Sequence, residues 1–512
     1  MEFQHSRPRR HSIECGGPPR WAVGQTGCVT WDFDVVVIGA GLSGIDAGYH
    51  LQTQCPDKTY TILEARSAMG GTWDLFRYPG IRSDSDLYTF GFPFKPWRDE
   101  MSLADGPAIK RYIEDTAAEF GIDRHIQFDS KVIAADFDTH TSTWTITLAD
   151  DRTITANFLY SCAGYYDYDQ GYLPDFAGMA DFQGTIVHPQ FWPEDLDYRG
   201  KRVVVIGSGA TAVTLIPAMA PDTAHITMLQ RSPTWISPLP RTDPVADFTR
   251  GHLPERAAHR LIRAKNIGLS TAFYRYARQF PKSAAKLLRG MAVKQLRDEH
   301  LVDEHFSPSY NVWDQRVCVA PDGDLFQTIT SGKADVVTAR IDRFVPEGIR
   351  LVSGEVLPAD IIITATGLQL LLNGGVEPTV DGSSVDLPEQ FVLLGAMITG
   401  LPNFAIAVGY TNASWTLRAD LTSRLVCKVL RWMGQQSYTW VVPESRAPLT
   451  PRPLLDMQSG YIQRAAGAFP RQGPKAPWRM RQNYMLDAVT TLRTDLGKYL
   501  RGGRNTVSTT TP

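Results

Sequence analysis

The most regular feature of the chain is an apolar run that leads directly into glycine-rich residues, and it occurs twice. "DFDVVVIGAGLSGIDAGYHL" (32–51) and "KRVVVIGSGATAV" (201–213) each combine a buried strand, a tight turn and the start of a helix. A run that is apolar at every position, rather than at every second one, is typical of a strand covered on both faces of a parallel sheet. The pattern therefore predicts two strand–turn–helix units.

Further apolar runs predict the strands that follow these units. They are "YTILEAR" (60–66), "FLYSCAGYY" (158–166), "AHITMLQRS" (224–232) and "LPADIIITATGLQL" (357–370). The small residues at 163–164 and 365–367 are expected to let the chain cross between domains close to a cofactor. Ordinary strand ends use the same residue types, so this alternative stays open.

Composition narrows the class of protein. Of the 512 residues, 43% are hydrophobic and 21% are charged, which is ordinary for a globular enzyme. The formal net charge of −2 argues against nucleic acid as a partner, because proteins that follow a phosphate backbone are usually strongly basic. The six cysteines show no CxxC pair and no metal-ligand spacing, which indicates reduced thiols, a cytoplasmic location and no metal site.

No window approaches the length of apolar sequence that a membrane span needs. Between Glu255 and His300, however, there are eleven Lys or Arg and three Asp or Glu, interleaved with apolar residues. Helices that lie on a membrane surface have this pattern. The segment predicts peripheral membrane contact or, alternatively, a solvated helical insertion that covers a substrate pocket.

The first glycine-rich turn has the spacing of a dinucleotide site. Gly39, Gly41 and Gly44 form GxGxxG: the first permits the turn, the second lets a pyrophosphate approach, and the third lets the helix pack closely on the strand. The phosphates would lie at the helix N-terminus. Glu64 ends the next strand, where it can accept hydrogen bonds from an adenosine ribose. These residues predict an FAD site, unless Glu64 is an ordinary surface carboxylate.

The second turn repeats this design, but the strand after it ends differently. The turn consists of Gly207, Ser208, Gly209, Ala210, Thr211, Ala212 and Val213. The next strand ends in Arg231 and Ser232 rather than in an acid. A carboxylate would repel the 2′-phosphate of NADPH, whereas a guanidinium forms a bidentate, charge-assisted pair with it. The second site therefore predicts NADPH, unless Arg231 is only a solvated surface charge.

The distance between the two turns predicts that one nucleotide domain is inserted into another. The fold class is then α/β with two dinucleotide-binding, Rossmann-like domains. We expect an FAD domain at 31–170 and 325–490 and an NADPH domain at 171–324, with a helical insertion at about 245–305. Flexible segments are expected at 1–30 and 491–512.

The segment "DFQGTIVHPQFWPE" (181–194) holds Gly184, His188 and Trp192 at spacings of four between the two turns. Together with one turn backed by an acid and one backed by an arginine, it resembles the fingerprint of the type I Baeyer–Villiger flavin monooxygenases. The resemblance implies that the segment links the two domains and couples movement of the NADPH domain to flavin chemistry. His188 is then structural and conformational rather than a base.

A second pattern of this family lies in "GTWDL" (71–75), followed by "YPG" (78–80) and Asp84. In relatives, this loop lines the flavin ring and the nicotinamide. The resemblance implies FAD contacts for Thr72, Trp73, Asp74, Leu75, Ser43 and Val132, and NADPH contacts for Arg82, Ser83 and Asp84.

Three further segments resemble one subgroup of this family. "YNVWDQRVCVAPDGDLF" (310–326), "VGYTNASWTLRADL" (408–421) and "PWRMRQNY" (477–484) resemble the mycobacterial-type ethionamide-activating monooxygenases. The resemblance runs from about Asp34 to Tyr484, which is most of the chain.

Arg316 matches the active-site arginine of the family. A deprotonated flavin peroxide needs a nearby cation that does not give up a proton, and Arg stays charged where a buried Lys could donate one. Asp84 is expected to hold and orient the guanidinium, and a buried Arg–Asp pair with no catalytic part is the alternative. Many relatives carry Lys before this arginine. Here Gln315 stands in that place, so Arg231 and Ser232 must supply most of the preference for NADPH.

The predicted protein is an enzyme, an FAD-dependent and NADPH-consuming monooxygenase. It inserts one oxygen atom of O2 into a small hydrophobic ketone through a C4a-peroxyflavin, giving an ester or lactone, and also oxidises sulfides or thiocarbonyls. An N- or S-oxygenating flavin monooxygenase without ketone activity is the alternative. A flavin-binding redox sensor is more remote, because it would have no use for Arg231, Asp84 and Arg316 together.

Overall fold

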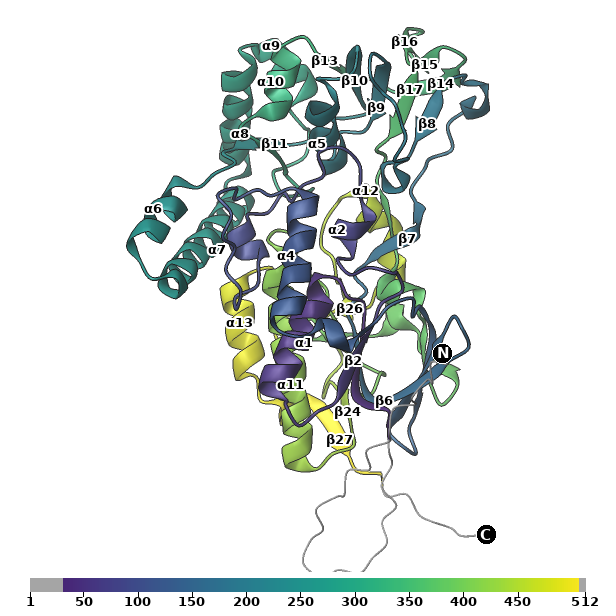
Figure 1. Cartoon of the computed structure of the whole chain (residues 1–512), viewed down its shortest axis with the longest axis vertical. Coiled ribbons are helices and arrows are strands. Elements are labelled where there is room, and N and C mark those ends of the chain that lie inside the picture. The colour runs from purple at the N-terminus through teal and green to yellow at the C-terminus, as the bar shows by residue number, and fades with distance from the viewer. Residues whose placement is uncertain (1–30, 506–512) are drawn as a thin grey trace, which may run out of the picture.

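Two domains, each built on its own sheet with parallel strands at its centre, lie one above the other along the long axis of the molecule (Figure 1). The computed structural model describes residues 31–505, so the predicted extension at 1–30 lies outside the described residues. The α/β architecture with two Rossmann-like units is the one that the apolar runs predict.

The first domain is built on a nine-stranded sheet. In spatial order its strands are β20 (Ser383–Ser384), β19 (Pro378–Val380), β4 (Val132–Asp138), β5 (Thr143–Leu148), β6 (Thr153–Ser161), β1 (Phe33–Ile38), β2 (Tyr60–Leu63) and β3 (Ile126–Gln127), with β23 (Phe404–Ile406) also paired with β6. The central strands are parallel, with Val36 opposite both Thr61 and Leu159. Burial on both faces explains why β1 is apolar at nearly every position.

Helices cover the first sheet. They are α1 (Leu42–Gln54), α2 (Thr72–Leu75), α3 (Leu87–Phe90), α4 (Gly106–Glu119) and α11 (Trp415–Gln436). The sequence sets the start of α4, because the carboxylate of Asp105 accepts from the Ala108 N–H at 2.8 Å and Pro107 occupies the first turn. Helices α1 and α11 pack against each other over the sheet.

The second domain is built on a five-stranded parallel sheet. Its spatial order is β13 (Ala334–Thr338), β10 (His225–Gln230), β9 (Arg202–Ile206), β17 (Ile361–Thr364) and β8 (Thr185–Val187). Helices α5 (Ala210–Met219) and α10 (Asp324–Thr330) and the small antiparallel sheet of β14 (Ile341–Val345), β15 (Gly348–Leu351) and β16 (Val356–Pro358) pack on it.

The predicted end of the second domain at residue 324 is wrong. Strands β13 and β17, which the prediction assigned to the FAD domain, belong to the second sheet. The reason is that β17 is buried on both faces between β9 and β8, so its apolar run completes the inserted sheet rather than the outer one. The chain returns to the first sheet at β19, which pairs with β4, and later adds β23 beside β6.

Two strands connect the domains. They are β7 (Tyr166–Gly171) and β18 (Leu368–Leu370), which pair with each other in antiparallel fashion. β7 follows the small residues 163–164, and β18 follows 365–367. The chain therefore crosses between the domains at the two places where small strand ends predicted a crossing.

Four helices extend the second domain. They are α6 (Pro244–His252), α7 (Glu255–Gln279), α8 (Pro281–Leu296) and α9 (Glu299–His305), which agrees with the helical insertion predicted at about 245–305. Two of them, α6 and α7, project sideways beside the first domain (Figure 1). Helix α7 packs against α3 of the first domain. Within residues 31–505, no helix combines the length and the apolar character needed to cross a bilayer.

The C-terminal part of the described chain is folded onto the first domain. After β24 (Trp440–Pro443) come β25 (Arg452–Pro453), α12 (Gly460–Ala465), β26 (Arg471–Gln472), α13 (Tyr484–Arg493) and β27 (Leu500–Gly503). β27 pairs with β24, and α13 packs against α11. The prediction of a flexible tail from residue 491 is therefore wrong for 491–505, because the backbone of this short segment completes a sheet edge.

Candidate active site

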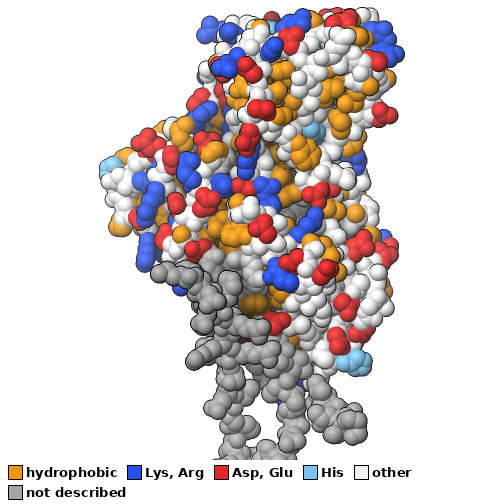
Figure 2. Space-filling view, turned by 45° about the vertical axis from the view of Figure 1, so that its right-hand side comes forward, with side chains coloured by type: hydrophobic (Ala, Val, Ile, Leu, Met, Phe, Trp, Pro, Cys, Tyr) orange, Lys and Arg blue, Asp and Glu red, His pale blue; other side chains and the backbone are white. Residues whose placement is uncertain are grey.

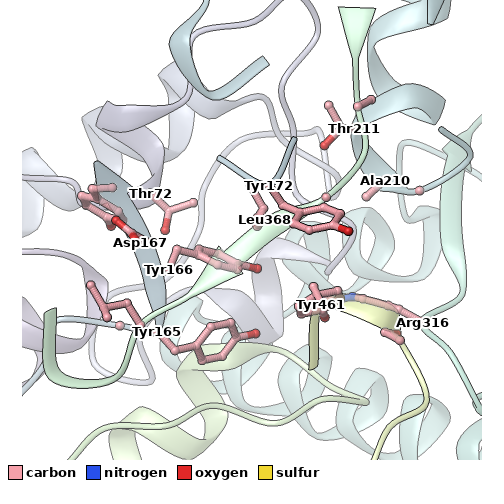
Figure 3. Close-up of a pocket in the computed structure, with 18 of the residues that line it drawn as sticks. Thr72, Tyr165, Tyr166, Asp167, Tyr172, Ala210, Thr211, Arg316, Leu368 and Tyr461 are labelled. Atoms are coloured by element: carbon pink, nitrogen blue, oxygen red, sulfur yellow. The ribbon is translucent and has the colours of Figure 1, made fainter. Parts of the chain in front are cut away.

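One cavity of about 1350 Å³ lies between the two domains and reaches both glycine-rich turns. Strand ends of the two sheets and the crossing strands β7 and β18 line it, and Figure 3 shows residues from both domains facing it. Ligands of open α/β sheets bind beyond the carboxyl ends of the strands, which is the position of this cavity. Its volume is large enough for more than one small molecule.

The first turn needs glycine at two positions for different reasons. Gly39 has φ +97°, and a Cβ there would lie 2.9 Å from the carbonyl oxygen of Cys162. Gly44 packs so closely on the turn that a Cβ would lie 1.9 Å from the Gly39 oxygen. Gly39 and Gly41 line the cavity, whereas Gly44 does not, so its part is the helix–strand packing that the motif predicts.

Glu64 is not a surface carboxylate. Its side chain is only 5% exposed and lines the cavity. One carboxylate oxygen accepts from the Ala40 N–H at 2.7 Å, and the other accepts from the Arg66 N–H at 3.0 Å. Burial raises the pKa of Glu64, and these two N–H donors oppose that rise. Each oxygen keeps a lone pair with which it can accept from a ribose hydroxyl.

The loop after Glu64 divides into residues that reach the cavity and residues that do not. Thr72 and Trp73 line the cavity. The carboxylate of Asp74 instead pairs with Lys110 at 2.8 Å and with Arg66. Burial would raise the pKa of Asp74, but these cations lower it below its ordinary value. Leu75 packs against the core of the second domain.

Asp74 and Leu75 do not line the cavity, so their predicted FAD contacts stay predictions that only their backbone could fulfil in this structure. Ser43 and Val132 do line the cavity, as the resemblance implies. The Ser43 hydroxyl accepts from the Trp415 indole N–H at 2.8 Å, so α11 fixes the first turn of α1.

The second turn repeats the backbone device of the first. Gly207 has φ +138°, and a Cβ there would lie 2.3 Å from the carbonyl oxygen of Ala365, at the end of β17. Gly207, Ser208, Gly209, Ala210 and Thr211 line the cavity. Ala212 and Val213 are fully buried in the core beneath the sheet. Their predicted cofactor contact stays a prediction and would have to come from the backbone N–H groups of the first turn of α5.

Arg231 and Ser232 are exposed and line the same cavity. Arg340 lies beside them: β13 runs parallel to β10 with Thr338 opposite Gln230, so both chains leave the sheet at the same edge. Arg340 is also exposed and lines the cavity. Within residues 31–505, neither arginine forms an ion pair. Sequence reasoning missed Arg340, although an arginine just after a strand next to β10 was a usable signal.

Arg82 and Ser83 line the cavity but have partners of their own. A guanidinium nitrogen of Arg82 lies 2.5 Å from a carboxylate oxygen of Asp324, at the start of α10. The Ser83 hydroxyl donates to the carbonyl oxygen of Ser85 at 2.9 Å. Arg82 therefore ties a loop of the first domain to the second domain at the edge of the cavity.

Arg316 lies where the cavity is rich in tyrosine. Figure 3 shows it next to Tyr461, with Tyr165 and Tyr166 on the same side. Burial by itself lowers the pKa of Arg316, but Tyr461 and then Asp84 raise it above its ordinary value. The guanidinium is therefore a permanent positive charge in the wall of the cavity.

Asp84 does not hold Arg316 directly, so this part of the prediction is wrong. Both side chains line the cavity, but within residues 31–505 no hydrogen bond or ion pair joins them. Burial raises the pKa of Asp84, and Arg316 and then Arg82 oppose the rise through space. Both groups line the same cavity, and each affects the pKa of the other through space.

The segment with the family fingerprint lies beside the crossing strands. A Cβ on Gly184 would lie 2.3 Å from the Asp360 carbonyl oxygen, and a Cβ on Gly171 would lie 2.3 Å from the His188 ring. His188 accepts at Nδ1 from the Gln190 N–H at 3.2 Å, and burial lowers its pKa. His188 and Trp192 do not line the cavity, and Trp192 packs against the core of the second domain. This is the interdomain position that the resemblance implies.

Comparisons with known proteins agree with this geometry. Residues 89–243 match the model of the flavin-binding monooxygenase-like family, and residues 37–101 match that of the NAD(P)-binding Rossmann-like domain. The FAD-containing monooxygenase EthA of Mycolicibacterium smegmatis is 53% identical over 464 residues, covering 90% of this chain and 94% of the relative. This chain belongs to the FAD-containing monooxygenases. EthA of Mycobacterium tuberculosis is 51% identical over 464 residues, covering 90% of this chain and 95% of the relative.

Solved structures show the same flavin monooxygenase fold. Oxidised steroid monooxygenase bound to NADP has a TM-score of 0.72 at 22% identity, covering 92% of this chain and 99% of that chain. OTEMO in complex with FAD and NADP has a TM-score of 0.69 at 23% identity, covering 81% of this chain and 87% of that one. The predicted likeness to a mycobacterial group of FAD-containing monooxygenases is confirmed by the EthA relatives, and FAD and NADP(H) are the cofactors that accompany this fold.

Proposed function

We propose that this flavin monooxygenase uses FAD and NADPH to insert one oxygen atom of O2 into ketones, giving esters or lactones. The observation that carries the proposal is the permanent charge of Arg316 among tyrosines, inside a cavity that both glycine-rich turns reach. A cation at this place stabilises negative charge that develops on oxygen during the transfer.

The chain has a fitting cradle for each cofactor. At the first turn, Gly39 and Gly41 present bare backbone to the cavity, and Glu64 offers buried carboxylate oxygens for a ribose. At the second turn, Arg231 and Arg340 offer guanidinium groups to a 2′-phosphate. When bound, FAD reduced by NADPH supplies the activation of O2. The protein supplies the positioning, the exclusion of water and the fixed charge.

Arg316 suits its part because it cannot act as an acid. A lysine at this position could deprotonate on burial and pass its proton to the oxygen species, whereas the raised pKa of Arg316 prevents this. Asp84 contributes a second, opposite charge that lines the same cavity. Its carboxylate limits the net positive field without capping the guanidinium, because no direct contact joins the two groups.

The substrate would enter the part of the cavity between Arg316 and the crossing strands. Its walls there are mainly aromatic or apolar: Tyr165, Tyr166, Tyr172, Leu368, Leu371 and Tyr461. Such walls favour a small hydrophobic ketone, sulfide or thiocarbonyl over a charged compound. A phenol O–H beside the cavity can donate to a substrate carbonyl oxygen.

The test is NADPH-dependent oxidation of a matched panel of linear, cyclic and aryl ketones and aryl sulfides, with product identification. Ester or lactone formation at a rate that accounts for most of the NADPH consumed is the expected result. Sulfoxide formation with no ester from any ketone would contradict oxygen insertion and favour an S- or N-oxygenating enzyme.

We further propose that the enzyme is cytoplasmic and rests peripherally on an anionic membrane through helices α7 and α8. Leu261, Leu269, Phe280 and Leu287 are 47–61% exposed on α7 and α8, among the basic residues of these helices. Figure 2 shows hydrophobic and basic side chains together on the projecting part. Co-flotation with anionic vesicles at low salt is expected. A solvated insertion would instead leave all of the protein in the dense fraction, and that result would contradict the proposal.

A further inference from the structure

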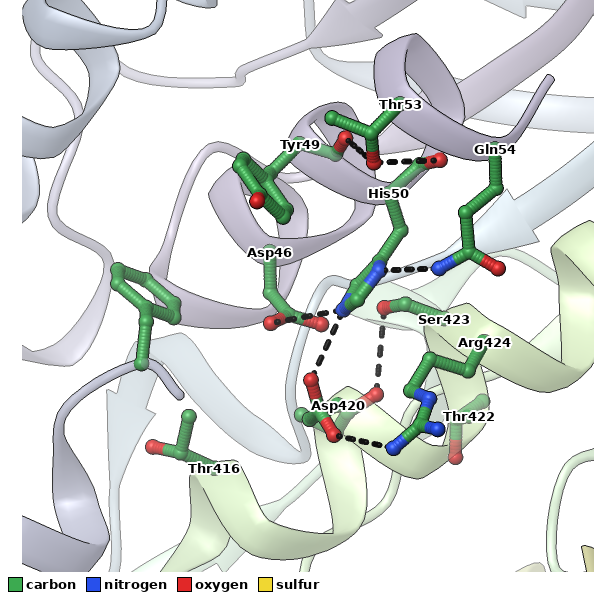
Figure 4. A network of polar contacts seen from close by, with 12 residues as sticks. Asp46, Tyr49, His50, Thr53, Gln54, Thr416, Asp420, Thr422, Ser423 and Arg424 are labelled. Atoms are coloured by element: carbon green, nitrogen blue, oxygen red, sulfur yellow. Dashed lines mark hydrogen bonds and ion pairs between the residues drawn. The ribbon is translucent and has the colours of Figure 1, made fainter. Parts of the chain in front are cut away.

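A second polar cluster lies away from the cofactor cavity, between α1 and α11. It consists of Asp46 and His50, one turn apart on α1, and Asp420 on α11 (Figure 4). All three are buried, with exposed fractions of 0%, 6% and 1%. One ligand atom from each lies within 4.8 Å of the others.

Asp46 is the unusual member of this cluster. Neither of its carboxylate oxygens accepts a hydrogen bond, although the side chain is fully buried, and its nearest charged neighbour is His50, with Nε2 3.7 Å from Oδ1. Asp420 has nearby partners, because His50 Nε2 lies 2.8 Å from one of its oxygens and Arg424 lies 3.7 Å from the other. A buried carboxylate without a donor is costly, so Asp46 needs a proton of its own or a positive charge beside it, which a protonated His50 or a metal ion can supply.

The three groups form a set that a metal ion can use. His50 Nε2 lies 3.7 Å from Asp46 Oδ1 and 2.8 Å from Asp420 Oδ1. Metal–ligand bonds of about 2.0–2.2 Å place neighbouring ligands about 3 Å apart, so shifts of less than about 1 Å suffice. Gln54 lies 2.7 Å from His50 Nδ1 and can orient the ring, as partners of metal-binding histidines usually do.

Access to this cluster does not pass through the cofactor cavity. A separate cavity of about 290 Å³ is lined by His50, Gln54, Asp420 and Arg424 among others. Asp46 lies behind it, and an ion entering from the surface would meet His50 and Asp420 first. Space on the cavity side leaves room for water as a further ligand.

We propose that Asp46, His50 and Asp420 bind one divalent first-row transition-metal ion that fastens α1 to α11. One imidazole and two carboxylates suit Zn²⁺, Mn²⁺ or Co²⁺, whereas Mg²⁺ and Ca²⁺ prefer oxygen ligands alone. Helix α1 carries the first glycine-rich turn at its N-terminus, so the ion would hold the helix on which the FAD phosphates are expected to rest. The sequence conceals this site, because Asp420 is 370 residues from His50.

A proton is the competing occupant. Burial raises the pKa of Asp46 to about 7, against the opposing effect of His50. The pKa of His50 is also raised, because Asp46 and Asp420 outweigh the effect of its burial. A metal ion must displace these protons, so its affinity should rise as the pH rises through neutrality.

The experiment is Co²⁺ binding to the tag-free full chain, followed by visible d–d absorption and by metal analysis after gel filtration. The wild type should take up about one ion per chain in a site that Zn²⁺ competes for. Affinity should increase from about pH 6 to about pH 8. The melting temperature should increase with Zn²⁺ concentration, since the ion binds the folded state.

The decisive variant is Asp46→Asn, which keeps the shape and removes the charge. The Asp46 carboxylate accepts no hydrogen bond that the substitution would break, so the variant should fold. Its affinity for Co²⁺ should be lower by about 100-fold or more. Asp57→Asn, at an exposed carboxylate just after α1, is the matched control and should bind as the wild type does. His50→Gln is a second test of the same ligand set.

Two results would overturn the proposal. One is a wild type that shows no d–d absorption and no uptake beyond that of the Asp46→Asn variant, which would mean that only a proton occupies the site. The other is equal Co²⁺ affinity in the wild type and both variants, which would place the metal elsewhere on the chain.

Discussion

The two glycine-rich turns share one backbone arrangement and differ in the charges behind it. Gly39 and Gly207 both have left-handed φ, and each lies against the carbonyl oxygen of a neighbouring strand end, Cys162 or Ala365. Behind the first turn stands a buried carboxylate held by backbone N–H groups. Behind the second stand two exposed arginines. The turn therefore selects a pyrophosphate, and the next strand end selects which nucleotide carries it.

The two turns also differ at the third position of the motif. Gly44 is in contact with the turn, where a Cβ would lie 1.9 Å from the Gly39 oxygen, whereas the matching position of the second turn is Ala212, buried without a clash. Helix α1 thus lies closer to its strand than α5 does.

Gly44→Ala should have the largest effect among the changes that test this difference. The added methyl group must displace backbone, so we expect a loss of about 3 kcal/mol or more in the free energy of unfolding, together with loss of FAD. Ala212→Gly, the matched change, should cost only about 1 kcal/mol through helix propensity. Thermal unfolding and flavin content measure both. Similar losses in the two variants would contradict the different packing of the two helices.

Arg231→Ala should have the next largest effect, and on one coenzyme alone. The KM for NADPH should rise about ten- to hundredfold, because a charge-assisted pair with the 2′-phosphate is lost. The KM for NADH should change little, since NADH has no such phosphate. Steady-state kinetics with both coenzymes measures the ratio of the KM for NADPH to the KM for NADH. Equal increases for the two would show that Arg231 does not contact the 2′-phosphate.

Arg340→Ala should have a smaller effect of the same kind. Arg340 is exposed beside Arg231, so it contributes mostly through screened charge, and the KM for NADPH should rise about two- to fivefold. The double variant should then lose selectivity for NADPH almost completely. If Arg340→Ala leaves the KM for both coenzymes unchanged while Arg231→Ala raises the KM for NADPH, then Arg231 and Ser232 alone supply the preference for NADPH, as the sequence predicts.

Most of the fold, and the opposite charges behind the two turns, could be predicted from the sequence, because apolar runs and GxGxxG spacing are local signals. Sequence reasoning misplaced β13 and β17, since an apolar strand in an inserted domain looks like one in the outer domain until pairing is known. The folding of 491–505 also depends on a long-range partner, as β27 has little apolar character of its own.

The candidate site shows the same limit. Arg316 and Glu64 could be identified from motif positions, whereas the orientation of Asp74 toward Lys110 could not, because Lys110 lies on a different helix. The sequence also predicted a direct Asp84–Arg316 contact, which the structure does not contain within residues 31–505. Two opposite charges that line one cavity need not form a direct ion pair, and here they interact only through space. Tyr461 escaped notice because it is distant in sequence from Arg316.

The measurement that tests the central claim most directly is the ratio of ester formed to NADPH consumed by Arg316→Ala. FAD should stay bound and NADPH should still reduce it, because neither step needs a cation at this position. Oxygen insertion into ketones should fall by about two to three orders of magnitude, with NADPH consumption diverted to hydrogen peroxide. Arg316→Lys should recover little, because an ammonium group can donate its proton. Near-normal ester formation by the alanine variant would contradict the account and show that Arg316 is structural.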